Sequence, residues 1–149
     1  MDPWDFERLA AIVDALAAGG PEAAADEVVR MALDLFRLYP GNFLEGEEAA
    51  WAIAQRERLR SKFLRSAAAL GGRLEGAGGF EQAEVHYRRA LEVDPLAEAF
   101  YCRLMRCLRA QGRVAEALEA YRRCRDLLSI TLGVQPSPHT QLIGLALQG

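Results

Sequence analysis

The side chains that could carry out chemistry are few, and their spacing does not group them into a site. The sequence has two histidines, His86 and His139, and three cysteines, Cys102, Cys107 and Cys124. Neither histidine stands at metal-ligand spacing from a cysteine or a carboxylate, and no two cysteines form a CxxC pair. We therefore expect both histidines at the surface and the cysteines as small core residues, without a metal, redox or disulfide role.

Sequence motifs for catalysis and for phosphate binding are also missing. The stretch EGAGG at 75–79 has the glycines of a phosphate loop, but it lacks the GKS/T ending and follows a predicted helix rather than a strand. No GxSxG, HExxH or DxDxDG motif occurs anywhere in the sequence. We predict a protein that is not an enzyme, with no catalytic residue, no cofactor and no metal.

Arginine is the residue type whose spacing suggests binding. All basic residues except Lys62 are arginines, whose guanidinium groups form bidentate contacts with carboxylates and phosphates. Arg103, Arg106 and Arg109 recur every three residues, which places them along one side of a helix. Residues 51–149 carry 15 basic and 10 acidic residues. Because these alternate and no reading helix or aromatic platform is evident, we expect no direct DNA binding by this chain.

The elements that position these side chains are predicted to be helices throughout. A first helix begins at Asp2 and Pro3, a second begins at Pro21 and ends before Pro40, and one long helix runs from Glu47 to about Arg73. The chain is 51% hydrophobic, which is enough for one domain with a core. No apolar run approaches the roughly 18 residues that a membrane span needs, so we expect no membrane association and a cytoplasmic location.

The second half of the chain contains an internal repeat of 34 residues. Its matching positions combine turn glycines, small residues and tyrosines, namely Gly78, Ala83 and Tyr87 in the first copy and Gly112, Ala117 and Tyr121 in the second. This spacing is typical of tetratricopeptide repeats, in which two antiparallel helices form one unit that stacks on the next. We predict repeats at about 64–97 and 98–131, with second helices at 80–93 and 114–128. The two tyrosines should be largely buried.

The predicted fold is all-α: a tetratricopeptide-like, right-handed stack of antiparallel helix hairpins, with about seven helices in a single domain over residues 1–149. A capping helix at about 137–147 should begin with Ser137 as N-cap and Pro138 at its first position. We expect its apolar residues Leu142, Ile143 and Leu145 to dock it on the stack. Because about three stacked units are needed for stability, the earlier helices must supply the remaining packing surface.

The chain also resembles a more specific family, the bacterial transcriptional activator domain. The resemblance rests on four phrases in the family's order: DPWDFERL, then LYPGNFLEG at 38–46 followed by Trp51 and RERLR, then YRRALEVDPLAEAFYCRLMRCL, and finally LGVQPSPHTQLI. In antibiotic-regulatory activators this domain follows a winged helix. The present sequence has no room for that DNA reader, so we expect an excised domain or a family member that lost its reader.

The resemblance implies a regulatory domain for protein contacts or oligomerisation and no enzymatic activity. Its partners would be other domains of the same regulator, a second copy, or the transcription machinery. The alternative function is a freestanding tetratricopeptide adaptor or a chaperone-like binding protein. A DNA-binding segment encoded upstream would distinguish the regulator from the adaptor.

The tetratricopeptide arrangement also predicts where a partner would bind. The first helix of each pair lines the concave side of such a stack, and in the second repeat that helix runs from about Leu96 to Ala110. The candidate groove positions are Arg65, Ala99, Cys102, Arg106 and Arg109. Two interpretations remain open: these arginines bind an acidic segment, or they are solvated or paired with nearby glutamates.

Overall fold

The computed structural model describes residues 50–149, and over this range the chain forms five helices and no strand. The helices are α3 (Ala50–Gly76), α4 (Phe80–Val93), α5 (Glu98–Ala110), α6 (Val114–Leu132) and α7 (Pro138–Gln148). The all-α prediction is confirmed for this part of the chain, and α3 corresponds to the predicted long helix. The two helices expected before it lie outside the described residues.

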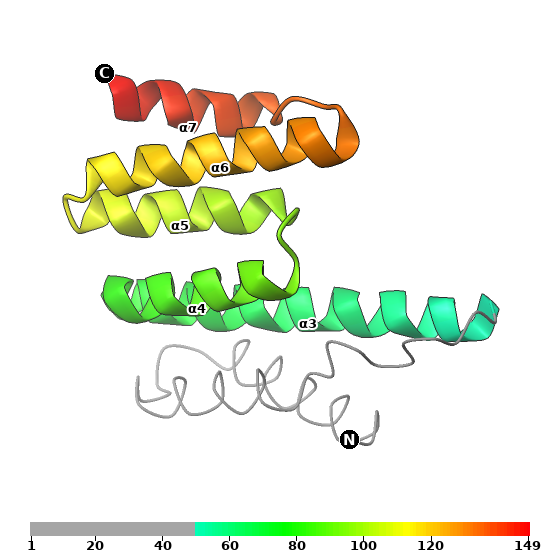
Figure 1. The fold of residues 1–149 in the computed structure, drawn as a ribbon. Coiled ribbons are helices and arrows are strands. Elements are labelled where there is room, and N and C mark those ends of the chain that lie inside the picture. Colours follow the sequence, from blue (N-terminus) through cyan, green and yellow to red (C-terminus); the bar gives the residue numbers. More distant parts are fainter. Residues whose placement is uncertain (1–49) are drawn as a thin grey trace. The chain divides into compact units, whose positions relative to one another are not determined.

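Two compact units divide the chain, Met1–Ala77 and Gly78–Gly149, so α3 belongs to the first and α4 to α7 belong to the second. Within the second unit α5 packs against both α4 and α6, and α7 packs against α6 and α5. From α4 to α7, consecutive helices run in opposite directions, so α5 and α7 run in the same direction (Figure 1). The predicted limits of α4 are confirmed, whereas α6 begins at Val114 as predicted but continues four residues beyond 128.

Glycines with positive φ lie in the turns between helices. Gly78 and Gly112 have φ of 80° and 75°, and Gly133 ends α6 with φ of 67°. Only glycine adopts this region without a steric cost from Cβ. At the end of α6 the amide of Gly133 donates to the carbonyl of Ser129 at 3.0 Å. The prediction that Gly78 and Gly112 serve the turns of the repeat is confirmed.

Burial follows the repeat at many equivalent positions. Ala83 and Ala117 are both fully buried, as is Tyr87. Tyr121 is half-buried, so it agrees with the prediction of a largely buried side chain but is less enclosed than Tyr87. The prediction of a surface position is wrong for His86, which is 4% exposed and meets the ring of Tyr87 edge-on. The three cysteines are buried, as predicted.

The capping helix α7 forms where the sequence predicts it, but a different face of it points inward. Its buried residues are Thr140, Gly144 and Leu147, whereas Leu142 and Leu145 are 65% and 63% exposed. A Cβ atom at Gly144 would lie 2.7 Å from Cε2 of Tyr121, so a glycine is needed for this approach of α7 to α6. The expectation that the two leucines dock the helix is therefore wrong, because close packing at the glycine selects the inward face.

None of the helices within residues 50–149 is both long enough and apolar enough to cross a membrane.

Candidate partner-binding groove

A cavity of about 610 Å³ lies between α5 and α7. The residues that line it from α5 include Ala99, Cys102, Arg103, Met105, Arg106 and Arg109. Those that line it from α7 include Thr140, Leu142, Ile143, Ala146 and Leu147. We call this cavity the α5–α7 groove.

Four of the five positions predicted for a partner groove line this one cavity. They are Ala99, Cys102, Arg106 and Arg109. The fifth, Arg65, is exposed on α3, which belongs to the first unit. The structure therefore brings together the predicted positions of the second repeat.

The three arginines that lie along one side of α5, Arg103, Arg106 and Arg109, do not have the same surroundings. Arg103 donates from Nη1 to the hydroxyl of Tyr87 at 3.3 Å, and its guanidinium carbon lies 6.0 Å from the centroid of that ring. These contacts hold Arg103 toward α4. Arg106 and Arg109 are exposed and line the cavity.

Where α5 and α7 meet, a buried polar contact joins them. The Sγ of Cys102 lies 3.2 Å from Oγ1 of Thr140, and both residues are buried. Burial raises the pKa of the Cys102 thiol and outweighs the opposing influence of the Thr140 hydrogen bond. The thiol is therefore held in its neutral form, and this part of the groove adds no charge of its own.

The N-terminus of α7 is held against α5 by Glu98. The amide of Ser137 donates to the two carboxylate oxygens of Glu98 at 2.9 and 3.3 Å. Ser137 is the N-cap of α7, as predicted, and its Oγ accepts from the amide of Thr140. A carboxylate at a helix N-terminus interacts favourably with the helix dipole. Here the carboxylate of Glu98 binds the N-terminus of α7 and so fixes that end of α7 to α5.

The α7 side of the groove is mostly apolar, although the exposed His139 and the buried Thr140 also line it. None of the residues of Pro138–Gln148 is aspartate, glutamate, lysine or arginine. Leu142 and Ala146 are exposed and Ile143 is half-buried, so apolar surface faces the solvent along this side. The groove thus has one side with exposed arginines and one mostly apolar side.

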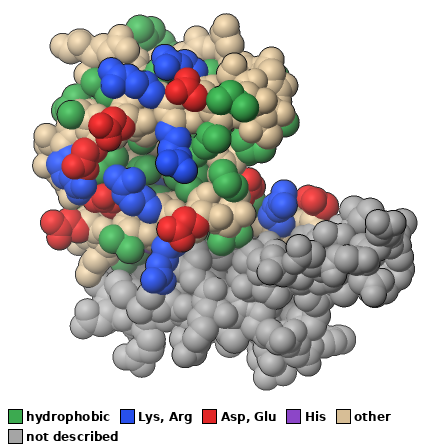
Figure 2. Space-filling model, viewed as in Figure 1, with side chains coloured by type: hydrophobic (Ala, Val, Ile, Leu, Met, Phe, Trp, Pro, Cys, Tyr) green, Lys and Arg blue, Asp and Glu red, His purple; other side chains and the backbone are tan. Residues whose placement is uncertain are grey.

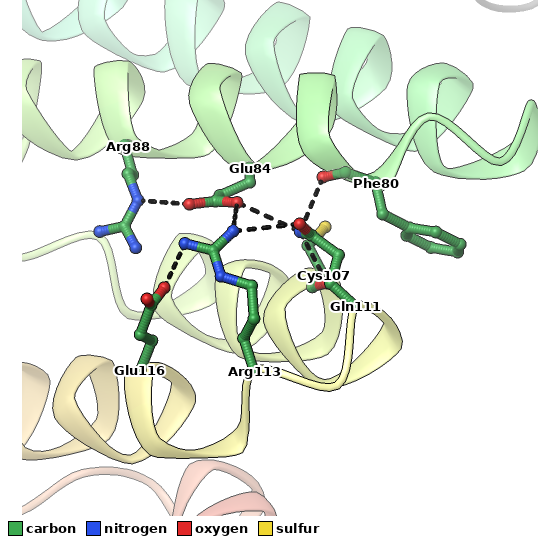
Figure 3. A network of polar contacts seen from close by, with 7 residues as sticks. All are labelled: Phe80, Glu84, Arg88, Cys107, Gln111, Arg113 and Glu116. Carbon is green, nitrogen blue, oxygen red and sulfur yellow. Dashed lines mark hydrogen bonds and ion pairs between the residues drawn. The ribbon is translucent and has the colours of Figure 1, made fainter.

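A network of ionic and amide hydrogen bonds lies at the C-terminal end of α5 (Figure 3). Glu84 of α4 is 8% exposed and accepts hydrogen bonds from Arg88 at 3.0 Å, from Gln111 at 3.1 Å and from Arg113. Gln111 also donates to the carbonyl of Cys107 at 3.1 Å. The network joins α4 to the turn between α5 and α6, and its ionic contacts are made within the unit.

The pKa of the Glu84 carboxyl lies below its ordinary value. Burial by itself raises this pKa, but the hydrogen bonds from Arg88, Gln111 and Arg113 together lower it by more. The carboxyl is therefore ionised at neutral pH, and it neutralises charge on the arginines around it. We assign this network a structural role, because its donors and acceptors satisfy one another.

A second cavity of about 740 Å³ lies among α4, α5 and α6. Its charged lining residues include both signs, with Arg88 and Arg123 beside Glu92, Glu116, Glu119 and Asp126. Mixed charge of this kind is also what Figure 2 shows, where basic and acidic side chains are interspersed over the visible face of the molecule. Neither this second cavity nor the face in Figure 2 would favour an acidic partner over a basic one.

Sequence reasoning missed the α7 side of the groove. Repeat counting covered the first helices of the two repeats, whereas Thr140, Leu142 and Ala146 come from a helix outside the repeat. The absence of charge in α7 was a usable signal, since a helix end that faces solvent normally carries polar residues. Among residues 50–149, no group of three or more histidine, cysteine, aspartate or glutamate side chains could hold a metal ion.

Comparison with known proteins places the chain in a family. The family described as "Bacterial transcriptional activator domain" matches residues 1–148. The regulatory protein AfsR of Streptomyces coelicolor is 33% identical over 138 residues, which cover 91% of this chain and 13% of AfsR. The chain thus spans a small part of the length of that relative. The match over almost the whole sequence shows that the chain belongs to the bacterial transcriptional activator domain family of transcription regulators.

Proposed function

We propose that this chain is the protein-interaction domain of a bacterial transcriptional regulator, and that the α5–α7 groove is its binding surface. The observation that carries the proposal is the convergence of four predicted groove positions on one cavity. Arg106 and Arg109 are exposed there, across from the apolar residues of α7. A cavity with apolar surface and a few convergent polar groups is the usual form of a binding site.

The proposal includes a tetratricopeptide-like, right-handed stack in a single domain with about seven helices. Two observations support it. Leu70 and Leu104 occupy equivalent positions and are each 2% exposed, and Leu74 and Leu108 are equivalent and almost fully buried. The turn glycines of the two copies also share positive φ. Stacked hairpins of this kind present the first helix of each pair to a partner.

In this proposal the chain acts in the cytoplasm on other proteins, which are a domain of its own regulator, a second copy, or a component of the transcription machinery. It is not an enzyme and does not read DNA itself. The interspersed charges on the face in Figure 2 support the last point, because DNA-binding surfaces concentrate basic residues. A duplex titration at moderate salt should detect only weak binding that salt abolishes.

The test is the double charge reversal Arg106→Glu and Arg109→Glu, introduced into the gene in its natural context. We expect normal folding, loss of the regulator's association with its partner in cross-linking, and altered transcription of its target genes. Arg122→Glu is the matched control, because this exposed arginine of α6 lines neither cavity. If folding and every association survive the double reversal unchanged, the groove is not the binding surface.

A further inference from the structure

The two sides of the α5–α7 groove differ in chemistry, so they favour different groups on a bound partner. Along α5, Arg106 and Arg109 are exposed and stand three residues apart, which is almost one helical turn. Along α7, Leu142 and Ala146 stand four residues apart and are also exposed. An occupant must therefore bring acidic groups to one side and apolar groups to the other, each repeated at about one helical turn.

The backbone of the occupant is constrained as well. The groove is lined by side chains of two helices whose backbone groups bond within their own helices, so it offers no open sheet edge. An extended peptide pressed against Leu142 and Ala146 would leave backbone N–H and C=O groups without partners, at a cost in free energy. A helix satisfies these groups internally and presents rows of side chains at three- and four-residue spacing.

We infer that the α5–α7 groove binds an amphipathic α-helix with an acidic stripe beside an apolar stripe. The acidic stripe pairs with Arg106 and Arg109, and the apolar stripe packs on Leu142 and Ala146. This inference rests on the proposed function and specifies the chemistry of the partner. A length of about three to four turns matches α5, because 13 residues of helix span roughly 20 Å.

Charge supports an acidic partner over a basic or neutral one. The carboxylate of Glu98, at the other end of the groove, already accepts two hydrogen bonds from the amide of Ser137. Among the lining residues that the structure describes, the exposed arginines are Arg106 and Arg109, and none of the α7 residues is aspartate, glutamate, lysine or arginine. Because Arg106 and Arg109 are exposed, their contribution to binding should weaken as ionic strength rises.

The experiment uses the full chain and fluorescently labelled synthetic peptides of about 14 residues. The probe peptide carries glutamates at three- and four-residue spacing on one side and leucines on the adjacent side. A second peptide has glutamine in place of each glutamate, and a third has proline at its centre to break the helix. Fluorescence anisotropy measures the three dissociation constants at low and moderate salt.

We expect the probe peptide to bind at micromolar concentration, with affinity at least tenfold above that of either control peptide and decreasing with salt. Arg109→Glu should weaken binding by about tenfold, and Leu142→Ser by about fivefold. The matched variant Arg122→Glu, on an exposed arginine outside the groove, should change it by less than about twofold.

Three outcomes would overturn the inference: no binding of the helical probe, equal binding of the proline peptide, or equal weakening by Arg109→Glu and Arg122→Glu. The second outcome would assign the groove to an extended peptide, and the third would indicate nonspecific attraction between charges. The proposed function is tested by a different experiment, the double charge reversal in cells. If the double charge reversal abolishes association in cells while the helical probe does not bind, the groove remains the binding surface and only the acidic helix is wrong.

Discussion

Tyr87 and Tyr121 occupy equivalent positions of the repeat, but their side chains are buried to different extents. Tyr87 is fully buried, with the ring of Phe100 at 5.8 Å between centroids and the guanidinium of Arg103 over its own ring. Tyr121 is half-buried and lies against Gly144 of α7. The same residue at the same repeat position thus reaches a different burial, because a different element covers it. Repeat periodicity predicts which positions point inward, and the next helix decides how completely they are enclosed.

The helices that carry the two tyrosines, α4 and α6, also differ three residues before the tyrosine. Glu84 of α4 is replaced at the equivalent position of α6 by Leu118. Glu84 joins α4 to the turn between α5 and α6 through ionic hydrogen bonds, whereas the junction of α6 with α7 depends on a glycine and on uncharged side chains. One junction is thus held by charge and the other by close approach, and they should respond differently to mutation and to pH.

The largest contrast should come from truncating the two tyrosines. Tyr87→Ala should lower the free energy of unfolding by about 3–5 kcal/mol, because it leaves a large cavity in the core. Tyr121→Ala should cost about 1–2 kcal/mol, since part of this ring is already in water. Urea denaturation followed by circular dichroism measures both losses. Losses below about 0.5 kcal/mol at both positions would mean that the repeat register is wrong.

The close approach of α7 can be tested at its glycine. Gly144→Ala should destabilise the protein by about 1–3 kcal/mol, because the added Cβ would lie 2.7–2.9 Å from three atoms of the Tyr121 ring. Gly76→Ala is the control, since a Cβ there meets nothing within 4 Å, and it should not reduce stability. Combining Gly144→Ala with Tyr121→Leu should cost less than the sum of the single changes. Simple additivity would contradict a clash between these two residues.

The charged junction should depend on Glu84. Glu84→Gln should lower stability by about 1–2 kcal/mol at neutral pH, because the amide cannot pair with Arg88 and Arg113 as the carboxylate does. Glu119→Gln, at an exposed position of α6, should change stability by less than about 0.5 kcal/mol. Chemical denaturation of the two variants side by side gives the comparison. If the two substitutions lowered the free energy of unfolding equally, the hydrogen bonds of Glu84 would not stabilise the protein more than an exposed carboxylate does.

The pH dependence provides an independent check on the same carboxyl. The pKa of Glu84 is lower in the folded protein than its ordinary value of 4.5, so its contribution to stability is fully present above about pH 4.5. That contribution is lost as the pH falls through the lowered folded pKa, because the unfolded chain then binds the proton more readily. The difference in stability between wild type and Glu84→Gln should therefore shrink below about pH 4.5. A difference that stays constant down to pH 3 would be incompatible with this account.

The smallest effect is expected at the uncharged contact between α5 and α7. Thr140→Val keeps the shape of the side chain but removes the hydroxyl near Cys102 Sγ and Ser137 Oγ. It should cost about 0.5–1 kcal/mol. Thr131→Val, at an exposed position of α6, is the matched control and should be close to neutral. A larger loss at Thr131 than at Thr140 would show that the buried contact does not help to dock α7.

Much of the helical framework could be predicted from local patterns. The limits of α4, the turn glycines with positive φ and the N-cap at Ser137 all follow from interactions among residues that are close in sequence. The groove was predictable only in part. Repeat counting identified its α5 side, including Arg106 and Arg109, but not the α7 side, which depends on how a helix outside the repeat is rotated.

The sequence by itself determined where helices in residues 50–149 run and which repeat positions carry small or large side chains. It did so because backbone hydrogen bonds within a helix and the conformational freedom of glycine are local properties. Only the tertiary structure decided that Leu142 points outward, that Tyr121 stays half-buried and that Glu84 gathers donors from a distant turn. These outcomes depend on which surfaces come into contact, and close packing at one glycine can rotate a helix away from the face that its hydrophobic residues predict.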